Sequence, residues 1–390
     1  MLLSGPRNKL LITGHPGSGK TTLIQRLFDS LKDRLRGYLL LGFITQELRS
    51  QGYRTGFKIQ WLHQRRELIL ARKSQEALGF PRVGSYEVFL HSIELTIENL
   101  QCYKGHSGKK LWIIDEIGKM ESLCVKFKDF IYSILESEDP MIASVGLSND
   151  PFLSKVRNCE KGVTVFLEPA YREYLFKRLL VEFTRKGKLL VFEGIDGSGK
   201  TTLTKKVADM LRSEGKDVLY LQEPGDTEPG KKLRMYLKGE LNLSKEEVLE
   251  LFLADRRERV EKEILPGLKE GKWIVMDRYY LSTVAYQGAQ GFDLKDLMIK
   301  NETIAPIPDL VIFLDVAPTE ALKRLNIRQH DTSVFEKLEF LDKVYQNYRK
   351  ILPNFKYAMI EARLDEEQAF HRVEDILHGE FEGAFSQDIM

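Results

Sequence analysis

The chain has few cysteines and no long apolar run. Its 390 residues include three cysteines, Cys102, Cys124 and Cys159, and none of them forms a C-x-x-C pair. This pattern contains no zinc motif and favours a reducing compartment, with the cysteines as small buried side chains. No apolar stretch approaches the roughly 18 residues of a membrane-spanning helix, and the N-terminus lacks the apolar core of a signal peptide. We therefore expect a cytoplasmic protein with no membrane partner.

The chain also lacks a net charge of either sign. Its 59 Lys and Arg residues against 57 Asp and Glu residues give a formal charge of +2. Such a balance provides no long-range field that would attract nucleic acid or anionic lipid. No stripe of alternating aromatic and basic residues suggests stacking on single strands. A nucleic-acid-processing ATPase is therefore disfavoured, we expect no nucleic-acid partner, and any phosphate-binding charge must be local.

Two glycine-rich stretches organise the sequence. Both fit G-x-x-x-x-G-K-[ST], and they are Gly14-His15-Pro16-Gly17-Ser18-Gly19-Lys20-Thr21-Thr22 and Gly194-Ile195-Asp196-Gly197-Ser198-Gly199-Lys200-Thr201-Thr202. In this motif backbone N–H groups surround phosphate oxygens, the Lys reaches the β- and γ-phosphates, and the next hydroxyl binds Mg²⁺. Each stretch follows an apolar strand-like run, at 9–13 and 189–193, and precedes a helix-like run. Lys20 and Lys200 are therefore candidate catalytic residues, and Thr21 and Thr201 are candidate Mg²⁺ ligands.

The two motifs predict two domains. Their lysines are 180 residues apart, which fits two complete nucleotide-binding domains in series. We expect an α/β protein with two P-loop NTPase domains in tandem, each a mostly parallel sheet with helices on both faces. The predicted domains are 1–186 and 187–378, joined by a short polar turn, and residues 379–390 form a polar tail.

The second signal in the first domain is an apolar strand at 110–116 that ends in two carboxylates, Asp115 and Glu116. In P-loop proteins a strand-terminal Asp helps to hold Mg²⁺. The adjacent Glu can activate a water molecule, because a neutral water needs a base within hydrogen-bond reach. The pair indicates hydrolysis of a nucleoside triphosphate. Arg49 and Arg54, in a predicted hairpin, either face the triphosphate or are simply solvated.

Residues 7–180 resemble the small cancer-related nucleoside-triphosphatase family. The resemblance rests on the first P-loop and on Gly42-Phe-Ile-Thr-Gln-Glu47, Arg54-Thr-Gly-Phe57, Val83-Gly-Ser-Tyr86 and Asp115-Glu-Ile-Gly-Lys-Met-Glu121. It implies hydrolysis of several nucleoside triphosphates, with Lys20 and Thr21 on phosphate and Mg²⁺, Asp115 on the metal side and Glu116 as water activator. The family often has Lys at the position of Ser85. The alternative for this domain is a non-catalytic, nucleotide-dependent regulatory module.

The corresponding strand of the second domain, at 273–279, has Arg278 after its Asp277. A guanidinium cannot deprotonate water, but it can hold a second phosphate with two hydrogen bonds. A phosphate monoester is already largely a dianion at neutral pH, so its transfer reaction needs cations rather than a base. This predicts a nucleoside-monophosphate kinase. Arg324 and Arg328, spaced i, i+4 on a predicted helix, either close over the phosphoryl group or form a solvated face.

Residues 188–378 resemble thymidylate kinase. The matching pieces are Phe192 through Thr202, Glu223-Pro-Gly225, Ala254-Asp-Arg256, Asp277-Arg-Tyr279, Ser282-Thr-Val-Ala-Tyr-Gln-Gly288, Pro308-Asp309 and Leu314-Asp-Val316. The resemblance implies transfer of the ATP γ-phosphoryl group to dTMP, giving dTDP, with Mg²⁺ as cofactor and a homodimer as the assembly. The whole chain is then bifunctional, a dTMP kinase joined to a nucleoside-triphosphate phosphatase.

The resemblance also implies roles for individual residues. Asp196 would reach the sugar 3′-hydroxyl and the acceptor phosphate, and Arg278 would hold the monophosphate. Phe252 would stack on thymine, Arg256 would read its O4 and Gln287 its N3. Glu223, Asp277, Ser282 and Tyr286 lie in the same motifs and would line the substrate site; Phe252 and Tyr286 also fit plain core packing. Gly197 stands where one subclass has Arg, which leaves Arg324 or Arg328 as the catalytic cation.

One loop departs from the thymidylate kinase pattern. The family usually has Arg at the position of Gln222, and a second Gly at the position of Asp226. The loop thereby loses a positive charge and gains a negative one close to the expected acceptor phosphate. An inactive kinase, or one directed to another nucleoside monophosphate, is therefore the alternative for this domain.

Overall fold

The computed structural model describes residues 3, 5–64, 66–74, 79–325, 332–361 and 363–382. The chain divides into two compact units, Met1–Thr184 and Arg185–Met390. Among the described residues no helix combines the length and the apolar character needed to cross a membrane. Most of the predicted polar tail, residues 383–390, lies outside the described part of the chain.

The N-terminal unit is built on a nine-stranded sheet with strand order β5-β6-β4-β3-β2-β7-β8-β1-β9. Five strands, β9, β1, β8, β7 and β2, are parallel, and β3, β4, β6 and β5 extend the sheet as antiparallel neighbours. The strands are β1 (Lys9–Thr13), β2 (Tyr38–Ser50), β3 (Tyr53–Trp61), β4 (Glu67–Lys73), β5 (Arg82–Val83), β6 (Tyr86–Val88), β7 (Lys109–Ile117), β8 (Met141–Val145) and β9 (Gly162–Phe166).

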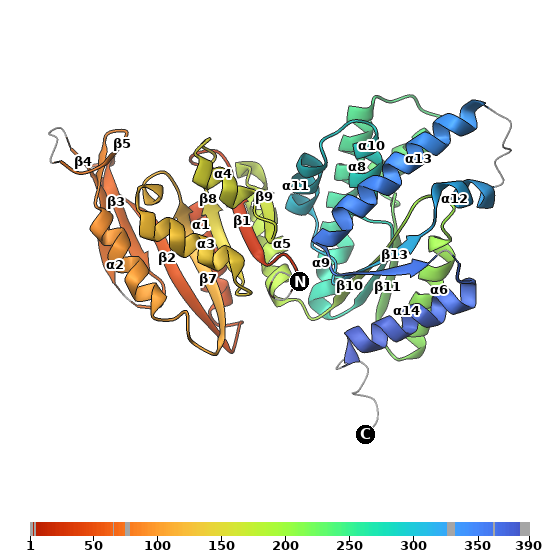
Figure 1. Ribbon diagram of the computed structural model, residues 1–390, viewed down its shortest axis with the longest axis horizontal. Helices are drawn as coiled ribbons and strands as arrows, with labels where there is room; N and C mark the ends of the chain where they lie inside the picture. The colour runs from red at the N-terminus through yellow and green to blue at the C-terminus, as the bar shows by residue number, and fades with distance from the viewer. Residues whose placement is uncertain are drawn as a thin grey trace, which may run out of the picture. The chain divides into compact units, whose positions relative to one another are not determined.

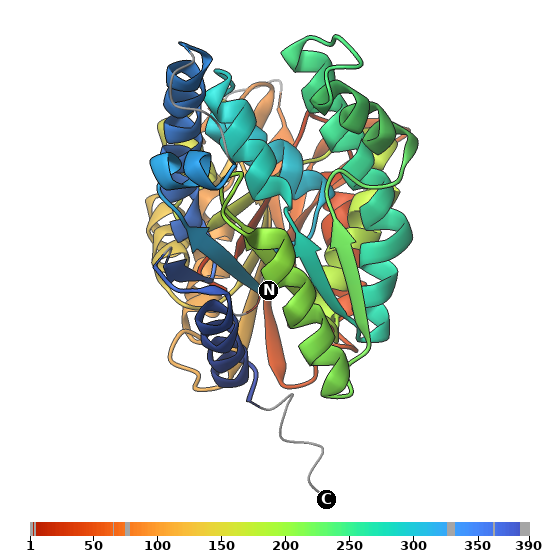
Figure 2. The same ribbon diagram turned by 90° about the vertical axis from the view of Figure 1, so that its right-hand side faces the viewer.

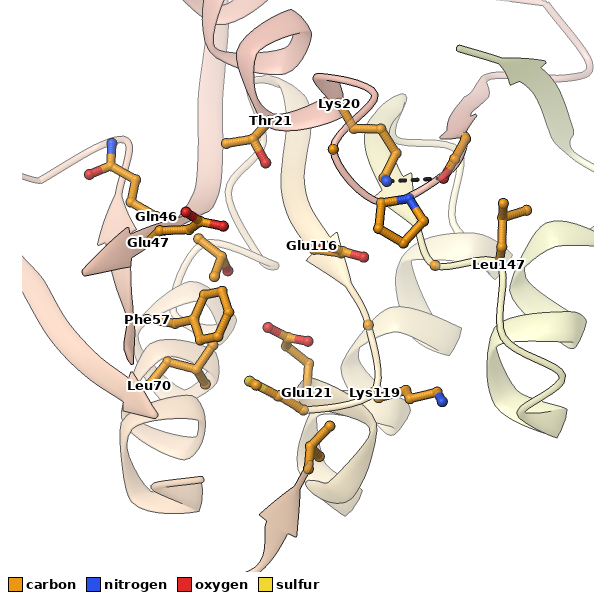
Figure 3. A pocket seen from close by; sticks show the side chains of 18 of the residues that line it. Lys20, Thr21, Gln46, Glu47, Phe57, Leu70, Glu116, Lys119, Glu121 and Leu147 are labelled. Atoms are coloured by element: carbon orange, nitrogen blue, oxygen red, sulfur yellow. Dashed lines mark hydrogen bonds between the residues drawn. The ribbon is translucent and has the colours of Figure 1, made fainter. Parts of the chain in front are cut away.

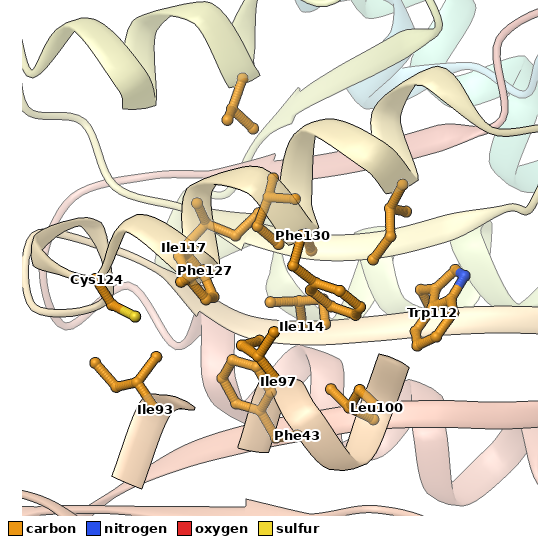
Figure 4. Close-up of a cluster of buried hydrophobic side chains, with 14 of the residues drawn as sticks. Phe43, Ile93, Ile97, Leu100, Trp112, Ile114, Ile117, Cys124, Phe127 and Phe130 are labelled. Atoms are coloured by element: carbon orange, nitrogen blue, oxygen red, sulfur yellow. The ribbon is translucent and has the colours of Figure 1, made fainter. Parts of the chain in front are cut away.

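Helices cover both faces of this sheet (Figure 1). They are α1 (Lys20–Leu31), α2 (Leu90–Gln101), α3 (Val125–Glu136), α4 (Pro151–Arg157) and α5 (Arg172–Thr184). Figure 4 shows the core on the α2 and α3 side, where Trp112, Phe43 and Phe130 pack together. Alternate strand residues such as Leu10 point to the opposite face, which α1 and α5 cover.

The C-terminal unit has a five-stranded, fully parallel sheet with strand order β11-β12-β10-β13-β14. Its strands are β10 (Lys188–Glu193), β11 (Val218–Gln222), β12 (Trp273–Asp277), β13 (Leu310–Asp315) and β14 (Tyr357–Glu361). Its helices are α6 (Lys200–Ser213), α7 (Glu228–Leu237), α8 (Lys245–Arg259), α9 (Leu265–Glu270), α10 (Tyr280–Ala289), α11 (Leu294–Ile304), α12 (Pro318–Arg324), α13 (Thr332–Ile351) and α14 (Glu366–Glu380). Helices α6 and α14 cover one face of the sheet, and helices that include α13 cover the other (Figure 2).

Each P-loop connects the carboxyl end of a central parallel strand to a helix, β1 to α1 and β10 to α6. Gly19 and Gly199 precede these helices with φ of 94° and 89°, a backbone conformation that glycine adopts at little cost. The carboxyl ends of parallel strands meet at one edge of a sheet. The strand-terminal carboxylates of β7 and β12 therefore lie on the same sheet edge as the P-loop of their own unit.

The predicted fold class, two α/β units of the P-loop type, is confirmed. The antiparallel extension is wider than the predicted hairpin, since β4, β5 and β6 follow it and none of the three was predicted. β5 and β6, with two and three residues, are too short to give a clear strand pattern. The hairpin turn between β2 and β3 is also shorter than predicted. It consists of Gln51 and Gly52, with φ of 49° and 82°, as the tight turns that match strand twist require.

Candidate active sites

A cavity of about 880 Å³ lies beside the N-terminal P-loop. Its walls come from the P-loop, from β2, β3, β4 and β5, and from the ends of β7 and β8 (Figure 3). Lys20 Nζ lies 3.1 Å from the Gly14 carbonyl oxygen and 3.4 Å from that of His15, so the ammonium group folds back over the loop. Thr21 and Glu116 also line the cavity. The structure thus brings the predicted hydrolytic residues to one cavity.

Asp115 and Glu116, at the end of β7, have different surroundings. Asp115 is fully buried, accepts a hydrogen bond from the Ser144 hydroxyl, and lies close to the Thr21 hydroxyl. Burial, followed by the charge of Glu116, raises the pKa of Asp115 to about 7, although hydrogen bonds from Ser144 and Thr21 oppose the shift. Glu116 points into the cavity. Asp115 is thus placed beside the hydroxyl that would bind Mg²⁺, and Glu116 beside the space for a reacting group.

A third carboxyl group, Glu121, also lines this cavity. Sequence reasoning included it only as part of a matching string and assigned it no role. Its residue is 3% exposed, in the short 3₁₀ turn Glu121–Leu123. A Cβ added at Gly118 would lie 3.0 Å from Glu121 Oε2 and 3.3 Å from Glu116 Cγ, so the two side chains flank that glycine. Burial, followed by the charge of Glu116, raises the pKa of Glu121 to about 8.

This pKa predicts a pH-dependent stability. The folded-state pKa of Glu121 is about 8, against 4.5 for an ordinary glutamate. Between these two pH values the folded unit keeps the proton on Glu121 whereas the unfolded chain loses it, so the stability of the N-terminal unit falls as the pH rises. Glu121→Gln should remove this pH dependence. From pH 5 to pH 8 the free energy of unfolding of the wild type should fall by at least about 1 kcal/mol more than that of the variant. The measurement is thermal unfolding followed by Trp61 and Trp112 fluorescence in a Trp273→Phe background.

Glu136→Gln is the matched control, because Glu136 is exposed at the end of α3. It should unfold with the pH dependence of the wild type. Parallel stability curves for wild type and Glu121→Gln would show that Glu121 does not hold a proton in the folded unit.

In the C-terminal unit, Lys200 is buried and donates to the Ile195 carbonyl oxygen at 2.8 Å and to Ser198 Oγ at 3.2 Å. Burial, followed by the charge of Arg278, lowers the pKa of Lys200 to about 7. Thr201 Oγ1 donates to Asp277 Oδ2 at 2.5 Å, and the other carboxylate oxygen of Asp277 is buried without a hydrogen-bond partner among the described residues. Mg²⁺ prefers one or two such oxygen ligands together with phosphate oxygens, so these residues fit the predicted ion.

Arg278 is the centre of a polar cluster at the end of β12. It donates to Ser282 Oγ at 2.9 Å and to Asp196 Oδ1 at 2.5 Å, and Tyr286 donates to Asp196 Oδ2 at 2.9 Å. Burial alone would raise the pKa of Asp196, but Arg278 and Lys200 lower it below its usual value. Arg278 also has φ of 69°, a left-handed conformation that is uncommon for residues other than glycine. The structure thus brings together four residues that the sequence placed on three separate motifs.

Glu193, at the end of β10, supports this cluster, and sequence reasoning assigned it no role. Its Oε2 accepts hydrogen bonds from Ser282 Oγ at 2.7 Å and from the Tyr348 hydroxyl at 2.9 Å. Its Oε1 accepts from the backbone N–H groups of Tyr279 at 2.9 Å and Ser282 at 3.1 Å. Burial raises the pKa of Glu193, and its hydrogen bonds oppose this shift. Glu193 therefore fixes Ser282, which in turn contacts Arg278.

The residues expected to recognise thymine lie on α8 and α10. Arg256 is buried and donates to Glu223 through Nε and Nη2, to Asn301 through Nη1 and to Thr283 through Nη2. These bonds use four of the five guanidinium donors. Gln287 is 3% exposed, and its Oε1 has no hydrogen-bond partner in the described part of the chain. Phe252 is only half-buried, whereas its helix neighbour Leu253 is buried.

The loop that departs from the family pattern is surrounded by arginines that the sequence did not single out. Asp226 is almost fully exposed and pairs with Arg234 at 3.0 Å. Arg234 also donates to the carbonyl oxygens of Pro224 and Gly225. Arg259 Nη1 donates to the Gln222 carbonyl oxygen at 2.7 Å. Arg259 also pairs with Glu263 at 3.2 Å, so each of the two arginines that contact the loop has a carboxylate partner.

The predicted flap arginines are only partly covered by the structure. Arg324 is the last residue of α12, and its Nε lies 3.3 Å from Glu320 Oε1. Arg328 lies outside the described residues. The expected pairing of the two on one helix face stays a prediction.

Comparison with known proteins agrees with this division of the chain. Residues 192–373 match the family model described as "Thymidylate kinase", and residues 9–180 match the one described as "NTPase". A "Thymidylate kinase" of Desulfotalea psychrophila is 46% identical over 159 residues, which are 40% of this chain and 78% of that protein. The chain belongs to the thymidylate kinase family.

Archaeal relatives of the thymidylate kinase unit align over similar or greater lengths. A "Probable thymidylate kinase" of Archaeoglobus fulgidus is 49% identical over 156 residues, covering 40% of this chain and 78% of that protein. One of Pyrococcus abyssi is 41% identical over 197 residues, covering 49% of this chain and 95% of that protein. The two resemblances predicted from the sequence, to a nucleoside-triphosphatase family and to thymidylate kinase, are confirmed.

Proposed function

We propose that the C-terminal unit transfers the γ-phosphoryl group of ATP to dTMP, giving dTDP, and that the N-terminal unit hydrolyses nucleoside triphosphates. The observation that carries this proposal is the contrast between two equivalent strand ends. Asp115 is followed by a carboxylate that points into a cavity, and Asp277 is followed by an arginine held between Asp196 and Ser282. The first arrangement suits activation of water, and the second suits binding of a second phosphate.

In the C-terminal unit the transfer needs positioning and positive charge rather than a base. Lys200 would contact the β- and γ-phosphates, and Arg278 would hold the dTMP phosphate. Thr201 and Asp277 would hold Mg²⁺ against the phosphate oxygens of ATP. Asp196 orients Arg278 through a 2.5 Å contact, and a flap arginine, Arg324 or Arg328, would complete the cation set.

In the N-terminal unit Lys20 and the backbone of the P-loop would bind the phosphates, and Thr21 and Asp115 would hold Mg²⁺. Glu116 would accept the proton of the attacking water. Glu116 lines the same cavity as the phosphate loop, and this position supports the role.

Recognition of dTMP would rest on Phe252, Arg256 and Gln287. Glu223 fixes Arg256 by contacts to two of its nitrogens, and with the bonds to Asn301 and Thr283 the described residues leave one guanidinium donor for a thymine oxygen. Arg234 pairs with Asp226 and offsets the negative charge that this residue adds to the loop, which supports dTMP as the substrate. We further propose a cytoplasmic homodimer that forms through the kinase unit.

Gln287→Ala tests this recognition directly. The variant should raise the KM for dTMP about tenfold, because one hydrogen bond to a buried polar group is worth roughly 1 kcal/mol or more. The KM for ATP should change less than about twofold. Steady-state kinetics with each substrate varied in turn measures both constants; an unchanged KM for dTMP would exclude Gln287 from the thymine site.

The experiment that tests the proposed function is ADP formation from Mg·ATP with each nucleoside monophosphate in turn, against a control without acceptor. We expect dTMP alone to raise the rate at least about tenfold above the control, and the remaining rate to release inorganic phosphate. If no monophosphate raises the rate, the kinase assignment is wrong. If no phosphate is released without acceptor although nucleotide binds, the N-terminal unit is a regulatory module.

A further inference from the structure

The cavity of the N-terminal unit extends beyond the P-loop and Glu116. One half is formed by the P-loop and Glu116, and the other by Phe57, Leu70 and Val83 on β3, β4 and β5. Figure 3 shows Phe57 and Leu70 on the far side of Glu116 from Lys20. The whole cavity has a volume of about 880 Å³. The second half therefore gives the cavity space beyond the phosphate loop and the side chain that would activate water.

The strand order shows why the triphosphate itself does not fill this half. The P-loop follows β1, Glu116 is near the end of β7, and β2, β3 and β4 continue the sheet beyond β7. If Glu116 faces the γ-phosphate, as proposed above, the α-phosphate and nucleoside extend in the opposite direction. Among the described residues, the cavity lining includes none from β9 or α5 on that opposite side. From β7 to β4 the sheet advances by three strands, or about 14 Å.

The chemistry of the second half suits an aromatic anion. Phe57, Leu70 and Val83 provide apolar walls near the buried Glu121 carboxyl group, and the Arg54 guanidinium lies 5.3 Å from the centre of the Phe57 ring. Arg54 and Arg49 both contact Glu47, at 2.8 Å and 2.5 Å, so two cations and one carboxylate leave a net positive charge at this rim. An aromatic ring would pack against Phe57 while an anionic group contacts Arg54.

We propose that this half of the cavity is an acceptor site, and that the N-terminal unit also phosphorylates a hydroxyl group on an aromatic, anionic compound. The inference rests on the proposed role of Glu116. The hydroxyl oxygen attacks the γ-phosphorus and forms a new P–O bond, the bond to the β–γ bridging oxygen breaks, and the nucleoside diphosphate leaves. The hydroxyl proton passes to Glu116. Attack by water in the same position gives hydrolysis.

The test uses the full chain carrying Lys200→Ala, so that the kinase unit is silent, and ATP labelled in the γ-phosphate. Nucleoside 3′-monophosphates are the probes, because each has an aromatic base, an anionic group and a free 5′-hydroxyl; the parent nucleosides lack the anion. We expect a labelled phosphate ester with at least one 3′-monophosphate, formed at least about tenfold faster than with its nucleoside.

Two cavity variants and one control locate the site. Phe57→Ala and Arg54→Ala should each raise the KM for the acceptor at least about tenfold more than the KM for ATP. Tyr53→Ala is the matched control, because Tyr53 is 78% exposed at the start of β3 and outside the cavity lining. It should leave ester formation unchanged.

Two outcomes would overturn the acceptor site. The first is that inorganic phosphate is the only labelled product with every probe. The second is that Phe57→Ala raises the KM for ATP as much as the KM for the acceptor, because the apolar half would then hold the nucleoside of ATP. Acceptor-free phosphate release measures the proposed hydrolase separately. If phosphate is released without acceptor but no ester forms, the acceptor site is wrong and the proposed hydrolase stands. If no phosphate is released, the proposed hydrolase itself is wrong.

Discussion

Glu116→Gln is expected to lower acceptor-free hydrolysis of nucleoside triphosphates by about a thousandfold, while dTMP phosphorylation stays within about twofold of the wild type. The amide keeps the shape of the side chain but cannot accept a proton from water. Glu116 and Arg278 lie in different compact units, each with its own P-loop, so the loss should be confined to one reaction. Phosphate release and dTDP formation, measured on the same preparation, give both rates.

Glu160→Gln is the matched control for this prediction, because Glu160 is an exposed residue of the same unit that does not line the cavity. Both of its rates should equal those of the wild type. An equal fall of hydrolysis and dTMP phosphorylation in Glu116→Gln would contradict two independent sites.

Arg278→Ala is expected to lower dTMP phosphorylation by about a thousandfold or more, because the guanidinium offsets the charge of two phosphates at once. Acceptor-free hydrolysis should remain. Arg278→Lys should recover only part of the loss, since an ammonium keeps the charge but not the two-pronged geometry that contacts Asp196 and Ser282. Initial rates of dTDP formation at saturating ATP measure the effect.

Arg212→Ala provides the comparison, because Arg212 is an exposed residue of α6 that pairs with Asp209 of the same helix. Removing Arg278 takes one cation away from Asp196 and Glu193, so the folded fraction is checked by Trp273 fluorescence in a Trp61→Phe, Trp112→Phe background. A folded Arg278→Ala variant that phosphorylates dTMP at the wild-type rate would refute the assigned role.

The features that could be predicted from the sequence are those that a short stretch of chain specifies by itself. Both P-loops, with their strand and helix on either side, are of this kind, because glycines at positive φ and a Lys at fixed spacing are needed regardless of the rest of the fold. The contrast between Glu116 and Arg278 could also be predicted from the sequence, since each residue comes at the end of an apolar strand.

The features that escaped prediction depend on contacts between distant residues. Glu193 gains its role from Tyr348, which is 155 positions away in the chain. Arg234 and Arg259 reach the 222–226 loop only because α7 and α8 pack beside it. Glu121 is recognisable as a buried acid only once β7 and its following turn are folded. No periodic pattern in the sequence predicts these contacts between distant residues.

The two-residue strand β5 has a consequence for the behaviour of the chain at high concentration. It forms one edge of the nine-stranded sheet, whose other edge is β9, and one of its two residues is an exposed arginine, Arg82. A long, flat terminal strand would offer a row of unpaired backbone groups to the same strand of another molecule, which is how edge-to-edge aggregates begin. So short and charged an edge offers few backbone groups for pairing, and we expect molecules of this protein not to associate through their β5 edges.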